Sequence, residues 1–129
     1  MDYLSDATFL IDLWREGRSK GAATRFADEH GDAVVAVPWI AKAEFLRGAF
    51  AVGQGPAAER FLGQFQTVWP NEGTLRIYAE LYGELRSVNA MIGPHDLWIA
   101  ACARECKVPL LTRNAEEFRR VPDLQVVEY

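Results

Sequence analysis

Hydrophobic positions along the chain follow two alternating patterns. Short apolar runs rich in β-branched residues, such as 33–37, predict strands of a parallel sheet that are covered on both faces. Between these runs, apolar residues recur every three or four positions, which predicts amphipathic helices. The expected strands end at Ser5 and cover 33–37, 68–69, 108–112 and 124–127. The expected helices cover 9–17, 19–29, 38–50, 57–65, 74–91 and 96–105, with a single helical turn at 115–118.

This alternation of strands and helices predicts an α/β fold. We expect a mostly parallel central sheet of four or five strands between two helical layers, which is a three-layer α/β/α sandwich. The length of 129 residues fits a single domain covering 1–129, because no internal repeat, linker or low-complexity segment interrupts it.

Composition narrows the class of protein. Half of the residues are hydrophobic and a quarter are charged, as in an ordinary globular domain. No apolar run is long enough to cross a membrane and no secretory signal precedes the first expected strand, so we expect a cytoplasmic protein with no membrane partner. Cys102 and Cys106 lie four residues apart in one expected helix. Packing of reduced thiols is favoured there over half of a zinc site, because no second Cys or His pair would complete the site.

The net charge of −4 argues against sequence-independent binding of long nucleic acids, which requires a basic face. A small site that processes nucleic acid is still compatible with this charge. Acidic residues gathered in such a site would lower the net charge, and a bound metal ion would restore local attraction for phosphate.

Four acidic residues lie where a strand or a turn leads into a helix. Ligands of open α/β sheets bind beyond the carboxyl ends of the strands, so these side chains could share one rim. Each also has a simpler interpretation: the two aspartates could cap or favour helix N-termini, and the two glutamates could be solvated surface charges. The four residues are Asp6, Glu44, Asp96 and Glu117.

Together these carboxylates predict a site for a hard divalent cation. Mg²⁺ and Mn²⁺ prefer oxygen ligands and keep several waters, so three or four carboxylates suffice. Packing the carboxylates together without a cation would be repulsive and would raise some of their pKa values. Such a cation can activate water and neutralise a phosphate during in-line displacement.

Four segments of the sequence resemble the PIN-domain ribonucleases, particularly the small VapC-like toxins of bacterial toxin–antitoxin pairs. They are Ser5–Asp12, Ala43–Gly48, His95–Ala101 and Leu111–Phe118, and the likeness covers essentially the whole chain. The last two segments are specific when taken together, whereas the first two are weak alone. The resemblance implies a PIN-like form of the expected three-layer sandwich.

The resemblance also implies roles for individual residues. Asn114 could share the role of the fourth metal ligand, and Thr112 would support the site through its hydroxyl group. The family's first motif usually reads Asp-Thr-Asn, whereas this chain has Thr8 at the third position, which changes the reach of that side chain. The residues that match the catalytic metal ligands are Asp6, Glu44, Asp96 and Glu117.

The activity that the resemblance implies is that of an endoribonuclease, with Mg²⁺ or Mn²⁺ held by the carboxylates while water attacks an RNA phosphodiester. It further implies a toxin that inhibits translation and growth, a homodimer, and an antitoxin whose C-terminal segment covers the active site. Arg113 and Arg47 are candidate RNA contacts, and a solvated or salt-bridged role is equally open for each. For His95, a structural or substrate-edge role is favoured over that of a general base.

Two other functions fit parts of the sequence. A phosphoacceptor signalling domain has a similar size and acidity, but it needs an acidic pair after the first strand and a late lysine, and this chain has neither. A PIN-like module that binds partners without cleaving RNA is the second alternative, and the presence of Thr8 supports it.

Overall fold

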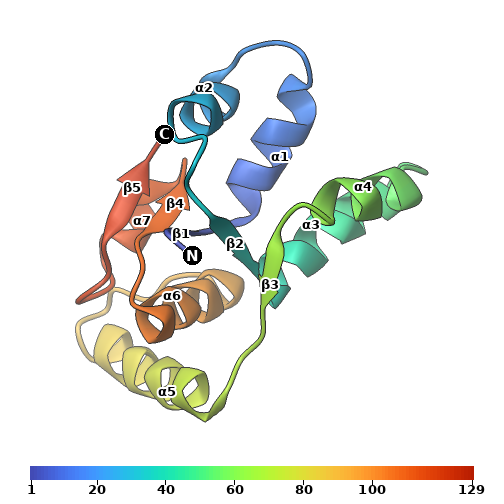
Figure 1. Ribbon diagram of the computed structural model, residues 1–129. Coiled ribbons are helices and arrows are strands. Elements are labelled where there is room, and N and C mark those ends of the chain that lie inside the picture. Colours follow the sequence, from blue (N-terminus) through green and yellow to red (C-terminus); the bar gives the residue numbers. More distant parts are fainter.

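A parallel five-stranded sheet forms the centre of the computed structural model, which describes residues 1–129. The strands run in the order β3-β2-β1-β4-β5 (Figure 1), and each neighbouring pair is parallel. Their bounds are β1 Tyr3–Ser5, β2 Val35–Pro38, β3 Gln66–Val68, β4 Leu110–Thr112 and β5 Val126–Glu128. The predicted α/β class is confirmed, with five strands and a fully parallel sheet.

Seven helices flank this sheet. In Figure 1, α1 and α2 lie on one side of the sheet and α5 and α6 on the other, while α3 and α4 run beside the β3 edge. This arrangement confirms the predicted sandwich. The helices are α1 Ala7–Glu16, α2 Ala22–Glu29, α3 Trp39–Ala51, α4 Gly55–Leu62, α5 Glu72–Ser87, α6 Pro94–Cys106 and α7 Ala115–Phe118.

The two faces of the sheet are buried by separate groups of side chains. Leu4 and Leu110 point into the larger hydrophobic cluster, which includes Leu85 of α5. Leu111, the next residue along β4, packs instead with Phe9 of α1 and residues of α2. Because successive side chains of a strand face opposite sides, both faces require apolar residues, and this explains the continuous apolar runs in the sequence.

Some element boundaries differ from the predicted ones because capping contacts set them. The helix predicted at 19–29 begins only at Ala22, where the Glu16 carboxylate accepts hydrogen bonds from the backbone of Ala23 and Thr24. The helix predicted from Thr74 begins two residues earlier, since Asn71 and Thr74 form a reciprocal capping box.

Helix α6 carries both cysteines. Cys102 is buried in the core and Cys106 is partly buried, and neither forms a disulfide. Burial raises the pKa of the Cys102 thiol to about 12, which is the behaviour of a packing residue. None of the helices has the length and hydrophobicity needed to span a membrane.

The order of the strands determines where a ligand can approach. The chain builds outward from β1 to β2 and β3, then returns through α5 and α6 to place β4 on the other side of β1. The boundary between β1 and β4 is therefore the switch point of the sheet, where open α/β folds leave a crevice at the carboxyl ends of the strands. Asp6 and Arg113 directly follow these two strands.

Candidate functional site

Asp6 lies at the centre of the switch point and is almost fully buried, with 3% of its surface exposed. It is the N-cap of α1, as the simpler interpretation predicted: its Oδ1 accepts hydrogen bonds from the backbone N–H of Thr8 and Phe9 and, at 2.6 Å, from the Thr8 hydroxyl. Its Oδ2 faces away from the helix. Capping therefore occupies one oxygen and leaves the other directed toward the neighbouring strand.

That second oxygen is held by β4. The register that pairs Ser5 with Leu111 brings Thr112 beside Asp6, and the Thr112 hydroxyl donates to Asp6 Oδ2 at 2.5 Å. Burial raises the pKa of Asp6, and the hydrogen bonds from Thr112 and Thr8 offset part of this rise. Thr112, for which the family resemblance implied a supporting role, therefore contacts Asp6 directly.

Asp96 and Glu117 form the second part of the site. Asp96 lies in the first turn of α6, and its pKa is raised to about 7 by burial, by its hydrogen bond to Glu117, and by the nearby charges of Glu117, Asp6 and Glu44. These three other carboxylates are the remaining members of the predicted set. The structure therefore gathers all four acidic residues near one another.

Glu117 is positioned by hydrogen bonds on both of its oxygens. The Gly93 N–H donates to Oε1 at 2.9 Å, and the Asn114 side-chain amide donates to Oε2 at 3.2 Å. Burial alone would raise the pKa of Glu117, but these donors, Asp96 and the charge of Arg120 lower it. Asn114 acts on this carboxylate here, so its geometry is that of a support for Glu117.

Glu44 reaches the site from α3, which follows β2. His95 Nδ1 lies 3.1 Å from Glu44 Oε1, but the angles are not those of a hydrogen bond, and this buried oxygen has no hydrogen-bond donor. A buried carboxylate oxygen without a donor is costly unless a cation or water completes it. The His95 side chain is half exposed, whereas that of Glu44 is mostly buried.

The carboxylates fit a divalent cation by their chemistry. In the present arrangement no three Asp, Glu, His or Cys side chains are close enough to share one ion. Asp6 accepts hydrogen bonds from two threonine hydroxyls, and Asp96 is hydrogen-bonded to Glu117. The orphaned oxygen of Glu44 and the raised pKa of Asp96 both indicate uncompensated negative charge. A hard cation with oxygen ligands would relieve both.

Comparison with known proteins identifies the fold family. A family model described as PIN domain matches residues 3–124. The chain belongs to the PIN-domain family. Ribonuclease VapC1 of Haemophilus influenzae is 30% identical over 129 residues, covering 97% of this chain and 96% of its own, so the chain also belongs among the VapC proteins.

Solved structures agree with this placement. VapBC-1 from nontypeable Haemophilus influenzae matches with a TM-score of 0.84 and 30% identity, over 99% of this chain and 98% of that one. VapBC2 from Rickettsia felis, solved with a DNA fragment from its promoter, matches with a TM-score of 0.86 over 100% and 99% of the two chains. Its identity of 22% supports the fold alone.

The sequence did not predict a network of contacts that lies beside the four carboxylates. Asp12 on α1 accepts a hydrogen bond from the Tyr129 hydroxyl at 2.7 Å and pairs with Arg113 Nε at 3.0 Å, both through Oδ2. The salt-bridged alternative for Arg113 is therefore what the structure shows, whereas Arg47 is exposed on α3. Asp12 lies four residues after Thr8 and so on the same helix face, which is the one signal available in the sequence.

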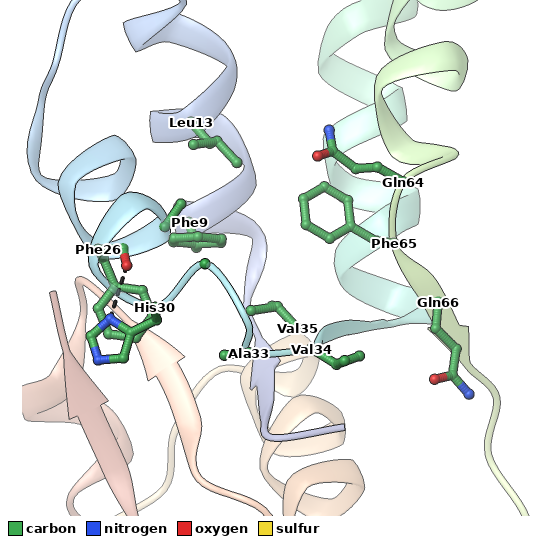
Figure 2. A pocket seen from close by; sticks show the side chains of 12 residues that line it. Phe9, Leu13, Phe26, His30, Ala33, Val34, Val35, Gln64, Phe65 and Gln66 are labelled. Carbon is green, nitrogen blue, oxygen red and sulfur yellow. Dashed lines mark hydrogen bonds between the residues drawn. The ribbon is translucent and has the colours of Figure 1, made fainter.

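Two cavities differ in their relation to the site. One of about 450 Å³ is bordered by Phe9, Phe26 and Phe65. Figure 2 shows the His30 ring turned toward the Phe26 carbonyl. His30 Nδ1 lies 2.9 Å from that carbonyl oxygen. None of the four carboxylates lines it. The other, of about 300 Å³, lies between α1 and α3, and Glu44 is part of its wall. Only the second cavity adjoins the candidate active site.

The burial of Asp96 and the repulsion from the neighbouring carboxylates predict that Asp96→Asn stabilises the metal-free protein at pH 8. The pKa of Asp96 is about 7 in the folded protein, above the value of 3.8 expected for an unfolded chain. The protonated form of Asp96 therefore stabilises the folded protein. This stabilisation is complete below the unfolded pKa and is lost as the pH rises through about 7. An asparagine avoids this loss, so in EDTA the melting temperature should rise by about 3 °C or more at pH 8 and change less at pH 5.

The exposed Asp32→Asn exchange is the control for this measurement, because Asp32 lies outside the carboxylate cluster. Differential scanning fluorimetry of both variants at the two pH values gives the comparison. Destabilisation by Asp96→Asn at pH 8 would show that the carboxylates do not oppose one another's ionisation.

Proposed function

We propose that this VapC-family ribonuclease toxin is a Mg²⁺- or Mn²⁺-dependent endoribonuclease that hydrolyses RNA phosphodiester bonds and thereby inhibits translation and growth. The observation that carries the proposal is the convergence of four carboxylates at the switch point between β1 and β4. This is where an α/β sheet binds its ligands, and the ribonuclease VapC1 of H. influenzae matches along nearly the full chain.

The metal ligands in this proposal are the four carboxylates, and a bound ion would supply activation of water and neutralisation of phosphate charge. The chain's own contribution is orientation. Thr112 and Thr8 fix both oxygens of Asp6, and Asn114 with the Gly93 N–H fixes Glu117. Side chains held in this way lose little conformational freedom when the substrate binds. The proposed ligands are Asp6, Glu44, Asp96 and Glu117.

The presence of Thr8 in place of the usual asparagine does not favour a purely binding function. Its hydroxyl still donates to Asp6 Oδ1 at 2.6 Å, so the contact expected at this position is made by a shorter side chain. The phosphoacceptor alternative has no support either, because the chain belongs to the PIN-domain family. Action on RNA is consistent with a cytoplasmic location, which we also propose.

The first test is RNA cleavage by the purified protein. We expect cleavage with Mg²⁺ or Mn²⁺ and none in EDTA, and we expect Asp6→Asn and Asp96→Asn to abolish it, since each removes a proposed ligand at the centre of the cluster. Asp32→Asn should cleave like the wild type. Fragment mapping by sequencing of RNA ends gives the readout, and circular dichroism checks that the variants fold.

Equal cleavage by the wild type and both inactive variants would indicate a contaminating nuclease and refute the assignment. A wild type that folds, binds metal and leaves RNA intact would support the binding-module alternative. Induced expression without a partner should also arrest growth for the wild type and Asp32→Asn, but not for Asp6→Asn or Asp96→Asn.

We further propose an antitoxin partner that covers the active site. Several matching structures are toxin–antitoxin complexes, among them VapBC-1 of H. influenzae and a complex from Klebsiella pneumoniae. The cavity between α1 and α3 supports this proposal, because Ile11, Trp14 and Phe45 make it apolar while Glu44 connects it to the carboxylates. A segment lying in this groove would reach the catalytic edge.

Filling this groove should weaken antitoxin binding. Gly48 lines the cavity and an added side chain would meet open space, so Gly48→Leu should project into the groove without disturbing α3. Gly83 on α5 is equally open and provides the control Gly83→Leu. With its cognate antitoxin, we expect Gly48→Leu to lower affinity at least about tenfold, a loss of roughly 1.4 kcal/mol measured by calorimetry. Equal affinities of both variants would place the antitoxin elsewhere.

A homodimer is also part of the proposal. Large hydrophobic side chains are exposed on α5 and after β3, including Leu75, Tyr82 and Trp69, the last with 67% of its surface accessible. Leu75 and Tyr82 are seven residues apart and so share one face of the helix. Exposed apolar side chains on one face support association with another protein surface.

A further inference from the structure

Asp12, Arg113 and Tyr129 form a cluster that the proposed metal chemistry does not use. The three residues come from α1, from the segment after β4 and from the segment after β5. The Tyr129 hydroxyl and Arg113 Nε both contact Asp12 Oδ2, at 2.7 and 3.0 Å. A single carboxylate oxygen therefore holds a phenol and a guanidinium from two other parts of the chain.

This cluster is connected to the carboxylate site through Thr8. The Arg113 backbone N–H donates to the Thr8 hydroxyl oxygen at 3.2 Å, and that hydroxyl donates to Asp6 Oδ1. Arg113 is thus fixed at its backbone by a residue that also contacts Asp6, and at its side chain by Asp12. Its position relative to the site is set by the same contacts that orient Asp6.

The guanidinium of Arg113 is fixed by Asp12 but can still contact a ligand. The Arg113 side chain is 59% exposed, whereas that of Asp12 is 17% exposed. Only Nε of Arg113 is engaged in an ion pair, and the terminal nitrogens of a guanidinium carry four further N–H donors. Two adjacent N–H groups of an arginine match two oxygens of a phosphate, so a fixed arginine at this edge is suited to bind one.

The Tyr129 hydroxyl strengthens this arrangement without adding charge. Its ring packs against Phe9 with centroids 5.2 Å apart, which holds the hydroxyl in place. Burial, together with the nearby Asp12, raises the pKa of the phenol, so it remains a hydrogen-bond donor to Asp12 at neutral pH. Asp12 is therefore fixed from one side by Tyr129 and presents its charge to Arg113 on the other.

We infer that Asp12 and Tyr129 position the Arg113 guanidinium to contact a backbone phosphate of the RNA substrate beside the carboxylates. This inference rests on the proposed ribonuclease function. Clustered carboxylates repel a polyanion, and a cationic side chain fixed at their edge supplies attraction where the scissile segment must enter. Fixing that side chain in advance also reduces the entropy lost when RNA binds.

The Arg113 contact is tested by the salt dependence of RNA binding. The probe is a short fluorescent single-stranded RNA of mixed sequence. All proteins in this experiment also carry Asp96→Asn, which we expect to prevent cleavage of the probe. Arg113→Gln should weaken binding about tenfold at low salt and reduce the slope of log affinity against log salt by about 0.7, the value for one phosphate contact on a single strand. Arg104→Gln, at the opposite end of α6 from Asp96, removes the same charge and should change neither.

Tyr129→Phe and Asp12→Asn test the positioning roles. Tyr129→Phe changes no charge, so a loss of RNA affinity of about threefold reports lost orientation. Asp12→Asn removes a negative charge, and general electrostatics would therefore increase affinity, whereas loss of positioning decreases it. We expect a decrease. Neither exchange should weaken binding further when Arg113 is already glutamine, because the positioning acts only through Arg113, so the double-mutant cycle should show a coupling energy equal to the whole positioning loss.

Higher RNA affinity in Asp12→Asn, or equal effects of Tyr129→Phe with and without Arg113, overturns the positioning roles. An unchanged salt slope in Arg113→Gln overturns the phosphate contact. Metal-dependent cleavage by the wild-type protein separates this failure from that of the proposed function, since cleavage with an unchanged slope refutes only the inference. A wild type that neither cleaves nor binds RNA refutes both.

Discussion

One buried and three partly buried carboxyl groups held close together at the switch point of the sheet are the constraint on which the rest of the structure depends. Asp6 is forced inward because it directly continues the central strand β1, and the other three acidic residues approach it from α3, α6 and α7. The fold offsets part of the resulting repulsion with hydrogen bonds from Thr112, Thr8 and the Gly93 N–H. Burial of Asp96 and the repulsion that remains together raise the pKa of Asp96 to about 7. Binding of a cation would relieve this repulsion and would therefore also stabilise the fold.

Thr8 connects the carboxylate site with Arg113. It donates to Asp6 and accepts from the Arg113 N–H, so one short side chain sets both an acidic and a basic group. The departure from the usual family motif is therefore accompanied by a specific set of contacts. An acidic centre with a fixed arginine beside it is the charge pattern that a phosphodiester and its metal ion require together.

The sequence predicted the layered fold well because the signal for it is local. Apolar runs such as 33–37 indicate strands covered on both faces, and the burial of Leu110 and Leu111 on opposite faces is the physical basis of that pattern. The strand order was not predictable from these runs, since it depends on crossovers between distant segments. Boundaries shifted where distant side chains cap a helix, as Glu16 does at the start of α2.

The candidate site was predicted unevenly for the same reason. Asp6 and Asp96 lie in short motifs, so their types and spacing could be recognised, and the structure brings them together. The contact between Asp12 and Tyr129 joins residues 117 positions apart and exists only because β5 lies next to β4. No local sequence pattern predicts that β4 and β5 are neighbours. Without this information the sequence could not decide between the alternative roles of Arg113.

The central claim is that the four carboxylates bind a divalent cation, and direct titration of the metal-free protein with Mn²⁺ tests it most simply. Electron paramagnetic resonance reports free Mn²⁺, so binding is measured without any RNA. We expect binding at pH 8, weaker binding at pH 6 because the proton on Asp96 competes at a pKa of about 7, and loss of binding in Asp96→Asn. Equal Mn²⁺ binding by the wild type and Asp96→Asn, or none by either, would contradict the account.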